Sequence, residues 1–470
     1  MRRPVAGMEI GGFTLGDRLH QGGFASIWAV THALYRSPLV MKVPTILDGY
    51  DGPTIVGFEV EQMILPRLTG AHVPKVYGVG GFDDMAYIVM EALPGGALLE
   101  RMGPGWPLSD LVGAAARLAG ALHALHLQGV AHLDLKPANI LQRDTGEMVL
   151  IDFGLARHED LPDLLDEEFA VPMGTYPYIA PEQYLRQRDD LRSDIFALGA
   201  MIYEMATGRA PFGVPETLKA ARKRLWRDPV PPRALRADLP EWLQEIILRA
   251  LEVDPARRYQ TAAQVQFDLQ HPGQVALTAR GRKVRPDGFW QVWHRWRKMR
   301  RVKRFDAPVS HGDQMARAPI LLVAVDLSPE GETLAPRLML WVRRMISLQP
   351  DSRIAVVNVI RTAVLGLDSG TDEAGENLHV ARLVGLRDWG RGLDLTEAQL
   401  TFTVLESSDP AAAIIDHATQ MRADHILLGA RGHSTTRRCL GSVSARVVAE
   451  AACSVTVIRA APDADADLKS

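Results

Sequence analysis

Two short polar runs constrain the fold and chemistry of this chain more than any other feature. Residues His132–Asn139 read HLDLKPAN, and Asp152–Gly154, which read DFG, begin thirteen residues after that run ends. The runs contain two carboxylates, an ammonium and an amide, at Asp134, Asp152, Lys136 and Asn139. Groups of these types at these offsets are typical of a loop that gathers them at one point. They match phosphoryl transfer, which needs a base for a hydroxyl proton, oxygen ligands for Mg²⁺ and a cation beside the moving group.

The two runs resemble the catalytic loop and the metal-binding motif of protein kinases, and Lys136 followed by Pro137 is similar to the serine/threonine branch. The resemblance implies that Asp134 is the catalytic base and that Lys136 stabilises charge during transfer. It also implies that Asn139 and Asp152 bind Mg²⁺ (or Mn²⁺) and that ATP is the phosphoryl donor. Proteins with serine or threonine hydroxyls are the implied substrates.

A lysine within an apolar strand is a second constraint. Residues 39–43 read LVMKV, and Lys42 needs a partner there because burying an unpaired ammonium costs several kcal/mol. Two glutamates of the following predicted helix, Glu59 and Glu61, project about 200° apart at helical spacing. We expect Glu61, four residues before the apolar Leu65, to pair with Lys42 and Glu59 to be solvated. The kinase resemblance implies that Lys42 then grips the α- and β-phosphates of ATP.

Two further segments are implied to bind ATP. Residues 13–28, FTLGDRLHQGGFASIW, predict a hairpin whose tip, Gly22 and Gly23, lets the backbone approach phosphate oxygens. Of the three glycines in the family pattern only Gly22 is present, which predicts a stiffer loop and weaker nucleotide affinity. Residues 86–91, AYIVME, predict the strand that leads into the adenine-binding hinge, with Met90 and Glu91 lining the pocket.

Residues 174–182, GTYPYIAPE, resemble the end of a kinase activation segment. The resemblance implies that Thr175 contacts Asp134 and that the following residues hold the protein substrate. We expect Glu182 to form an internal ion pair with Arg257, a pair that specifies geometry more than it adds stability. Asp194 is expected to cap a helix and to brace the backbone of the catalytic loop.

The activation segment lacks the usual features of a phosphorylation switch. No serine, threonine or tyrosine occurs between Gly154 and Gly174. Leu133 stands where many kinases have an arginine that pairs with a phosphate on this segment. These two departures predict an active conformation that does not depend on a phosphate there. The acidic residues of the segment, Asp163 among them, are expected to be solvated, and attraction of basic substrates is the alternative.

Residues 280–304 form a basic, tryptophan-rich connector with eleven lysines and arginines and one acid. On a single helix, its apolar residues except Trp290 fall within about half the circumference. One interpretation is that the tryptophans dock on a neighbouring domain while the charges face water. The second is a basic amphipathic helix on an anionic membrane. Nucleic-acid binding, disfavoured by a net charge of −3 for the whole chain, and self-inhibition are the remaining interpretations.

After residue 318, apolar β-branched runs alternate with helical stretches, which predicts a parallel sheet covered on both faces. Ligands of such sheets bind at the carboxyl ends of the strands. The region resembles a universal stress protein domain, and its candidate nucleotide-binding residues are Asp326, Gly429, Gly432, Gly441 and Ser442. The family pattern has nine residues between its second and third glycines, whereas this sequence has eight between Gly432 and Gly441. The alternative is a dimerisation module that pairs through residues 454–459.

Length and composition favour several globular units. For 470 residues we expect a bilobal α+β kinase domain at 9–271, a linker at 272–317, an α/β domain with a doubly wound five-stranded parallel sheet at 318–460 and a flexible tail at 461–470. The two cysteines make no disulfide framework, and no signal peptide or run of eighteen apolar residues occurs, which favours a cytoplasmic protein. The alternative function is a catalytically weak or silent nucleotide sensor or scaffold, suggested by the missing loop glycines.

Overall fold

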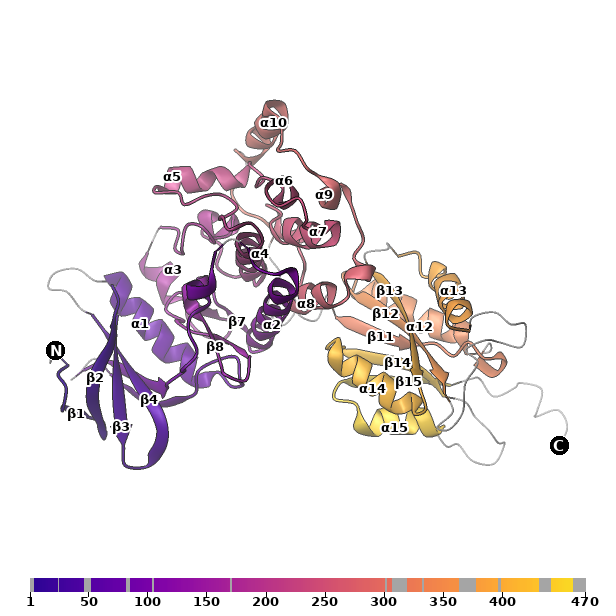
Figure 1. Ribbon diagram of the computed structural model, residues 1–470, viewed down its shortest axis with the longest axis horizontal. Helices are drawn as coiled ribbons and strands as arrows, with labels where there is room; N and C mark the ends of the chain where they lie inside the picture. The colour runs from indigo at the N-terminus through magenta and orange to yellow at the C-terminus, as the bar shows by residue number, and fades with distance from the viewer. Residues whose placement is uncertain are drawn as a thin grey trace. The chain divides into compact units, whose positions relative to one another are not determined.

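The computed structural model describes residues 4–23, 25–45, 52–81, 85–103, 105–169, 171–300, 302–306, 319–331, 334–362, 378–395, 399–430 and 441–459. The chain forms two compact units (Figure 1). The first contains Met1–Pro272 and Leu277–Gln314, and the second contains Gly273–Ala276 and Met315–Ser470. Among the described residues, no helix combines the length and the apolarity that crossing a bilayer requires.

The first unit begins with a six-stranded antiparallel sheet in the order β1-β2-β3-β4-β6-β5, beside which helix α1 lies (Figure 1). The elements are β1 Glu9–Ile10, β2 Phe13–Gln21, β3 Ala25–His32, β4 Tyr35–Pro44, α1 Gly52–Ile64, β5 Val76–Gly80 and β6 Tyr87–Glu91. Strands β2 and β3 form the predicted hairpin, with Gly22 and Gly23 at its tip. Alternation along the strands buries one set of side chains, such as Trp28 and Val30, against the sheet core.

A mainly helical lobe follows. Its elements are α2 Leu108–His126, β7 Val130–Ala131, β8 Ile140–Gln142, β9 Met148–Leu150, β10 Arg157–His158, α3 Leu164–Glu168, α4 Arg192–Thr207, α5 Leu218–Ala221, α6 Pro232–Leu235, α7 Glu241–Ala250 and α8 Ala262–Gln270. Helix α4 is buried on nearly every face and ends at Gly208, whose φ of 69° is the left-handed geometry that glycine adopts without strain. Small residues of α2 such as Ala115 and Ala119 are fully buried, which lets neighbouring helices approach closely.

The connector is two short helices rather than one amphipathic helix. They are α9 Ala279–Arg282 and α10 Phe289–Met299. Pro286 lies between them, and proline cannot continue a helix because it lacks the backbone donor. Trp293 and Trp296 of α10 are half-buried, whereas Phe289 and Trp290 at its start are 73% and 69% exposed. The apolar stripe expected for a continuous helix is therefore interrupted.

The second unit is the predicted five-stranded, all-parallel sheet, in the order β13-β12-β11-β14-β15. Its elements are β11 Ile320–Ala324, α12 Ala335–Leu348, β12 Arg353–Arg361, α13 Leu378–Arg391, β13 Leu400–Ser407, α14 Pro410–Gln420, β14 His425–Ala430, α15 Ser442–Glu450 and β15 Ser454–Arg459. Helices α14 and α15 lie together on one face of the sheet, and α12 and α13 cover the other (Figure 1). The central strand β11 is almost wholly buried, as its continuous apolar sequence predicts.

Candidate active site

A cleft of about 640 Å³ in the first unit collects the polar residues of both catalytic motifs and of the strand lysine. Its lining includes every cleft residue expected from the sequence, namely Gly22, Gly23, Lys42, Glu61, Met90, Glu91, Asp134, Lys136, Asn139 and Asp152. These residues come from the sheet, from α1 and from loops of the helical lobe. The tertiary fold therefore brings side chains separated by up to about 130 residues to one place.

Lys42 joins the sheet, α1 and the DFG motif. Its Nζ lies 2.5 Å from Glu61 Oε2 and 2.9 Å from Asp152 Oδ1. Burial acts to lower the pKa of Lys42, but the charges of Glu61 and Asp152 outweigh burial and raise that pKa above its usual value. The positive charge of Lys42 in turn lowers the pKa of Asp152 to about 2. Burial raises the pKa of Glu61 above its ordinary value, although the charge of Lys42 acts to lower it. Lys42 and Asp152 are thus ionised at neutral pH, and Lys42 holds both carboxyl groups in place.

The structure selects Glu61 over Glu59 as the partner of Lys42. Glu61 is 2% exposed and faces the cleft, whereas Glu59 is half-exposed. Helix α1 approaches the DFG motif closely, because a Cβ added at Gly57 would lie 3.0 Å from the carbonyl oxygen of Gly154. Sequence reasoning did not find Gly57, and a glycine within a predicted helix was the available signal.

Asp134 is the centre of the polar network on the catalytic loop. Its Oδ1 accepts hydrogen bonds from Thr175 N at 3.0 Å and Thr175 Oγ1 at 2.7 Å. Its Oδ2 accepts from Lys136 Nζ at 2.6 Å and from Asn139 Nδ2 at 3.3 Å. Lys136 Nζ also donates to Thr175 Oγ1 at 3.2 Å. The carboxylate is 8% exposed and points into the cleft with both oxygens oriented.

The cleft offers oxygen ligands suited to a divalent cation. Asn139 uses its amide nitrogen to donate to Asp134 O at 3.0 Å, which leaves its amide oxygen for a metal. Asp152 contributes an ionised carboxylate that is 44% exposed. A carboxylate and an amide oxygen are hard ligands of the kind that Mg²⁺ prefers, and substrate phosphates and water complete its coordination in such sites.

The catalytic loop has a strained backbone that Asp194 stabilises. Leu133 has a φ of 62°, uncommon for a side-chain-bearing residue. Asp194 accepts hydrogen bonds from the backbone N–H groups of His132 and Leu133, each at 2.8 Å, and lies 3.0 Å from His126 Nε2. Burial acts to raise the pKa of Asp194, but these contacts lower it overall. The expected brace is present; the expected helix cap is wrong, because α4 begins without a side-chain cap.

Met90 and Glu91 are the last two residues of strand β6 in the sheet. Met90 is 9% exposed and pairs with Val40 across the β4–β6 ladder. The Glu91 side chain accepts a hydrogen bond from Arg143 Nη1 at 2.8 Å and from Lys75 N at 2.9 Å, and these contacts, that of Arg143 foremost, lower its pKa. The Glu91 side chain is therefore engaged by Arg143, and its backbone N–H donates to Lys75 O at 2.9 Å.

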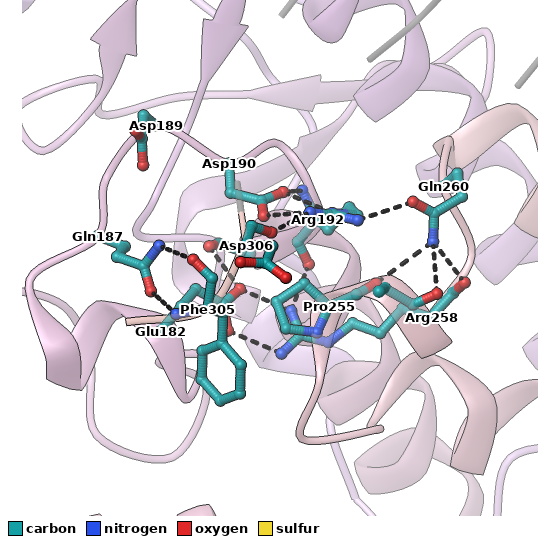
Figure 2. Close-up of polar contacts among 12 residues, drawn as sticks. Glu182, Gln187, Asp189, Asp190, Arg192, Pro255, Arg258, Gln260, Phe305 and Asp306 are labelled. Atoms are coloured by element: carbon teal, nitrogen blue, oxygen red, sulfur yellow. Dashed lines mark hydrogen bonds and ion pairs between the residues drawn. The ribbon is translucent and has the colours of Figure 1, made fainter. Parts of the chain in front are cut away.

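The ion pair that anchors the activation segment uses Arg258, not Arg257 (Figure 2). Arg258 Nη1 and Nη2 lie 2.6 and 2.7 Å from Glu182 Oε1 and Oε2, and both residues are almost fully buried. Ser193 Oγ donates to Glu182 Oε1 at 2.7 Å. The expected partner Arg257 is exposed. The reason is the 3₁₀ turn Pro255–Arg257, after which the chain becomes extended and turns the next side chain inward.

The end of the connector and the two residues after it, Phe305 and Asp306, are attached to the segment that follows this anchor (Figure 2). Gln187, which is 4% exposed, donates to Phe305 O at 2.9 Å and accepts from Phe305 N at 2.7 Å. Arg192 Nη2 donates to Asp306 O at 3.2 Å. Arg304 forms an ion pair with Asp189 at 2.8 Å.

Ion pairs hold the start of the connector on the same unit. Arg295 Nη1 lies 2.5 Å from Asp228 Oδ2 and also pairs with Asp287. Lys283 Nζ lies 3.6 Å from Asp228 Oδ2 and 2.5 Å from Oδ1 of Asp287, which is itself in the connector. The interpretation in which the charges face water is therefore wrong for Lys283 and Arg295, which pair with Asp228. The aromatic and cation–π contacts of Trp293 and Trp296 lie within α10 and its C-cap, so docking of the tryptophans stays a prediction.

The second unit has its own pocket of about 440 Å³ at the carboxyl ends of its strands. Asp326, Gly429, Gly441 and Ser442 line it. Gly432 lies outside the described residues. Gly331 also lines this pocket, and a Cβ added there would lie 2.3 Å from Asp326 O. Sequence reasoning did not find Gly331, although a glycine soon after the first strand of the sheet was an available signal.

In the first unit, Lys42 of the antiparallel sheet and Glu61 of α1 line the same cleft as Asp134, Asn139 and Asp152 of the helical lobe. This arrangement defines a protein of the kinase class. Residues 13–271 match the family model of the protein kinase domain, and residues 319–459 match that of the universal stress protein family. The chain therefore belongs to the protein kinase family and carries a universal stress protein domain.

Bacterial kinases are among the proteins to which the chain is similar. A probable serine/threonine-protein kinase of Clostridium perfringens is 33% identical over 215 residues, which are 45% of this chain and 31% of that protein. Serine/threonine-protein kinase PknB of Mycobacterium tuberculosis is 31% identical over 264 residues, 55% of this chain and 42% of that protein. The chain thus spans less than half the length of these relatives. The solved kinase domain of Mycobacterium tuberculosis PknI aligns with a TM-score of 0.46 at 23% identity, over 57% of this chain and 99% of that one.

Proposed function

We propose that this protein is a serine/threonine kinase that transfers the γ-phosphoryl group of MgATP to hydroxyls of protein substrates. The observation that carries this proposal is the network around Asp134, which orients one carboxylate beside Lys136, Asn139 and Thr175. Asp134 accepts the hydroxyl proton, and Lys136 offsets charge on the phosphoryl group. Thr175 and the anchored segment that ends at Glu182 position the substrate.

The same proposal assigns the nucleotide-binding roles. Lys42, held by Glu61, binds the α- and β-phosphates, and Asn139 and Asp152 hold Mg²⁺, with Mn²⁺ as the alternative metal. Gly22 and Gly23 cover the phosphates. Met90 and Glu91 border the adenine. A cytoplasmic location is part of the proposal because the reaction consumes ATP.

Transfer of label from radiolabelled ATP to a generic basic protein, and to the kinase itself, tests the proposal. Asp134→Asn should abolish labelling, because the amide cannot accept the proton, whereas Asp144→Asn at an exposed turn should not change it. Replacing Mg²⁺ by Mn²⁺ in the same assay identifies the preferred metal. Equal labelling by wild type and Asp134→Asn would contradict the proposal. It would favour the alternative, a catalytically silent sensor or scaffold.

We also propose that the second unit binds a nucleotide at Asp326, Gly429, Gly441 and Ser442, with Gly432 as a further candidate. The support is the pocket at the strand ends and the helix α15 that begins beside it, because helix N-termini attract phosphates. ATP titration of full-length Lys42→Met protein, whose first site is weakened, should still report one site. Asp326→Ala in that background should remove it.

Homodimerisation through β15 is a proposal on separate grounds. In the described sheet β15 is an edge strand that pairs only with β14, so its outer backbone groups are available to a second copy. Pairing would raise the local concentration of one kinase domain near another. Sedimentation analysis should show a dimer, and Val457→Pro in β15 should convert it to a monomer. A wild-type monomer at micromolar concentration would contradict this proposal.

Peripheral contact with an anionic membrane is the third proposal about partners. It is supported by the exposed Phe289 and Trp290 at the start of α10 and by the exposed Arg297 and Lys298 in its last turn. Vesicles containing anionic lipid should sediment the wild-type protein but not a Phe289→Ala/Trp290→Ala variant. Neutral vesicles should sediment neither. Nucleic acid is not a proposed partner.

A further inference from the structure

A carboxylate within the activation segment forms ion pairs with two arginines. Arg188 Nε donates to Asp163 Oδ2 at 2.8 Å and to Asp163 Oδ1 at 3.1 Å. Arg157 Nε lies 3.7 Å from Asp163 Oδ2. The side chains of Asp163 and Arg188 are only 17% and 10% exposed, so solvent screens this pair far less than an ordinary surface pair. Asp163 is therefore not the solvated residue that the sequence suggested.

The three residues tie together the beginning, middle and end of the segment. Arg157 is in β10, three residues after the DFG motif, and Asp163 is the N-cap of α3. Arg188 follows the anchor at Glu182, and its Nη2 also donates to Leu155 O at 3.0 Å. A single guanidinium thus holds the residue that follows Gly154 and the cap of α3 at the same time.

This cluster is connected to the Lys42–Glu61 pair through packing. Helix α3 packs against α1, the helix that carries Glu61. Phe169, directly after α3, lies against the first residue of α1, because a Cβ added at Gly52 would lie 3.6 Å from its ring. Displacing α3 would therefore remove support from α1 and from the glutamate that orients Lys42.

Two parts of the usual phosphorylation switch are absent from the sequence, as noted above. Residue 133 is leucine, and residues 155–173 contain no hydroxyl to phosphorylate. In switchable kinases, a phosphate on this segment orders it by pairing with arginine. Here Asp163 supplies the anion, and Arg188 and Arg157 supply the cations.

We propose that Asp163 is a positioning residue that, through Arg188 and Arg157, permanently orders the activation segment as a phosphate does in switchable kinases. The proposal deepens the proposed kinase function and rests on it. It predicts that the segment is assembled as soon as the chain folds. Loss of the Asp163 charge should then lower turnover without lowering the stability of the kinase unit as a whole.

The structure provides a matched control on the same short helix. Asp166 pairs with Arg186 at 3.1 Å, but these side chains are 50% and 43% exposed. An exposed pair of this kind contributes little because solvent screens it. Asp163→Asn and Asp166→Asn are therefore identical chemical changes in two environments, three residues apart.

The test compares kinetics and hydrogen exchange of full-length variants. Asp163→Asn should lower kcat about tenfold or more, as expected for the loss of a charge-assisted, largely buried contact, and Asp166→Asn should stay within about twofold of wild type. Amides of residues 155–169 and of α1 should exchange faster in Asp163→Asn only, while the unfolding temperature stays unchanged. Arg188→Gln should have the same effect. The double variant should lose less kcat than the product of the two single losses, because both substitutions remove the shared Arg188–Asp163 pair.

Several outcomes would overturn the proposal. One is a loss of kcat in the double variant equal to the product of the two single losses. Another is an equal effect of Asp163→Asn and Asp166→Asn on kcat. The third is an unchanged rate of amide hydrogen exchange in α3 and α1 of Asp163→Asn. If Asp163→Asn does not fold, Arg188→Lys replaces it in the test. Lysine keeps the positive charge but loses the planar set of donors of the guanidinium, so its kcat should be intermediate. A wild-type kcat in Arg188→Lys would also overturn the proposal. If wild-type protein transfers no phosphate, the proposed function fails. Hydrogen exchange alone then decides whether Asp163 orders the segment.

Discussion

Arg258 and Glu182 form a two-point ion pair, with nitrogen–oxygen distances of 2.6 and 2.7 Å, and the side chains of both residues are inaccessible to solvent. The pair joins the end of the activation segment to the turn before α8. Arg258 Nη1 also donates to Arg192 O at 2.8 Å, so the guanidinium connects three segments. A pair in this position specifies one arrangement of the chain, because either partner alone would be a buried, uncompensated charge.

Arg258→Ala should destabilise the first unit by about 3–5 kcal/mol, since it leaves the Glu182 carboxylate buried without its partner. Arg257→Ala, one residue away but exposed, should change stability by about 0.5 kcal/mol or less. Chemical denaturation of the two full-length variants measures both effects. Similar stability losses in the two variants would contradict the assignment of Arg258 as the anchor.

The Lys42–Asp152 contact predicts a specific pH dependence of stability. Lys42 lowers the pKa of Asp152 from its ordinary 3.8 to about 2 in the folded state. The unfolded chain therefore takes up this proton first as pH falls. The contribution of ionised Asp152 to stability is complete above about pH 4 and is lost as pH falls toward 2.

Urea denaturation of wild type and Asp152→Asn at several pH values tests that dependence. The difference in unfolding free energy between the two proteins should be constant from about pH 5 to 8 and should shrink below pH 4. Asp144→Asn, at an exposed turn, serves as the control. A difference that is the same at pH 3 and pH 7 would show that Lys42 does not lower the pKa of Asp152.

Phosphatase treatment should leave kinase activity unchanged. Residues 155–173 offer no hydroxyl to a kinase, and residue 133 offers no arginine to a phosphate. Activity is measured before and after treatment, with mass spectrometry to confirm that phosphate has been removed. Loss of most activity would mean that a phosphorylated residue elsewhere in the chain controls the enzyme.

Gln187→Ala should release the end of the connector from the kinase unit. The side chain makes two hydrogen bonds to the backbone of Phe305, each worth about 1 kcal/mol. The Phe305 amide should therefore exchange roughly tenfold faster or more. Asp189→Asn, which weakens only the pair with the 65% exposed Arg304, should have little effect. Unchanged exchange at Phe305 in Gln187→Ala would show that the connector is held elsewhere.

Periodicity predicted the parallel sheet of the second unit, and the resemblance of the motifs to those of protein kinases implied the bilobal fold of the first. The glycine-tipped hairpin, the lysine-bearing strand and the alternating strands and helices after residue 318 all appear as expected. Local sequence carries this information because side chains on a strand or helix recur at the period of that element. The choice of Glu61 over Glu59 followed from the same rule.

Contacts between distant segments could not be predicted in the same way. Arg257 and Arg258 are equally plausible partners for Glu182 until the 3₁₀ turn at Pro255 shows which of them points inward. Asp163 looked like one of several acidic loop residues, because Arg188 is 25 residues away in sequence. Pro286 is the sequence signal that the connector is not one helix, because proline cannot continue a helix.

The amino-acid sequence alone determined the kinase class of the first unit, the parallel sheet of the second and the absence of a phosphorylatable residue from 155–173. Only the tertiary structure decided three further pairings of cation and anion: Lys42 with Asp152, Arg258 with Glu182, and Arg188 with Asp163. The reason is physical. Secondary structure depends on neighbours along the chain, whereas an ion pair depends on the direction of two side chains whose separation is set by the folding of everything between them.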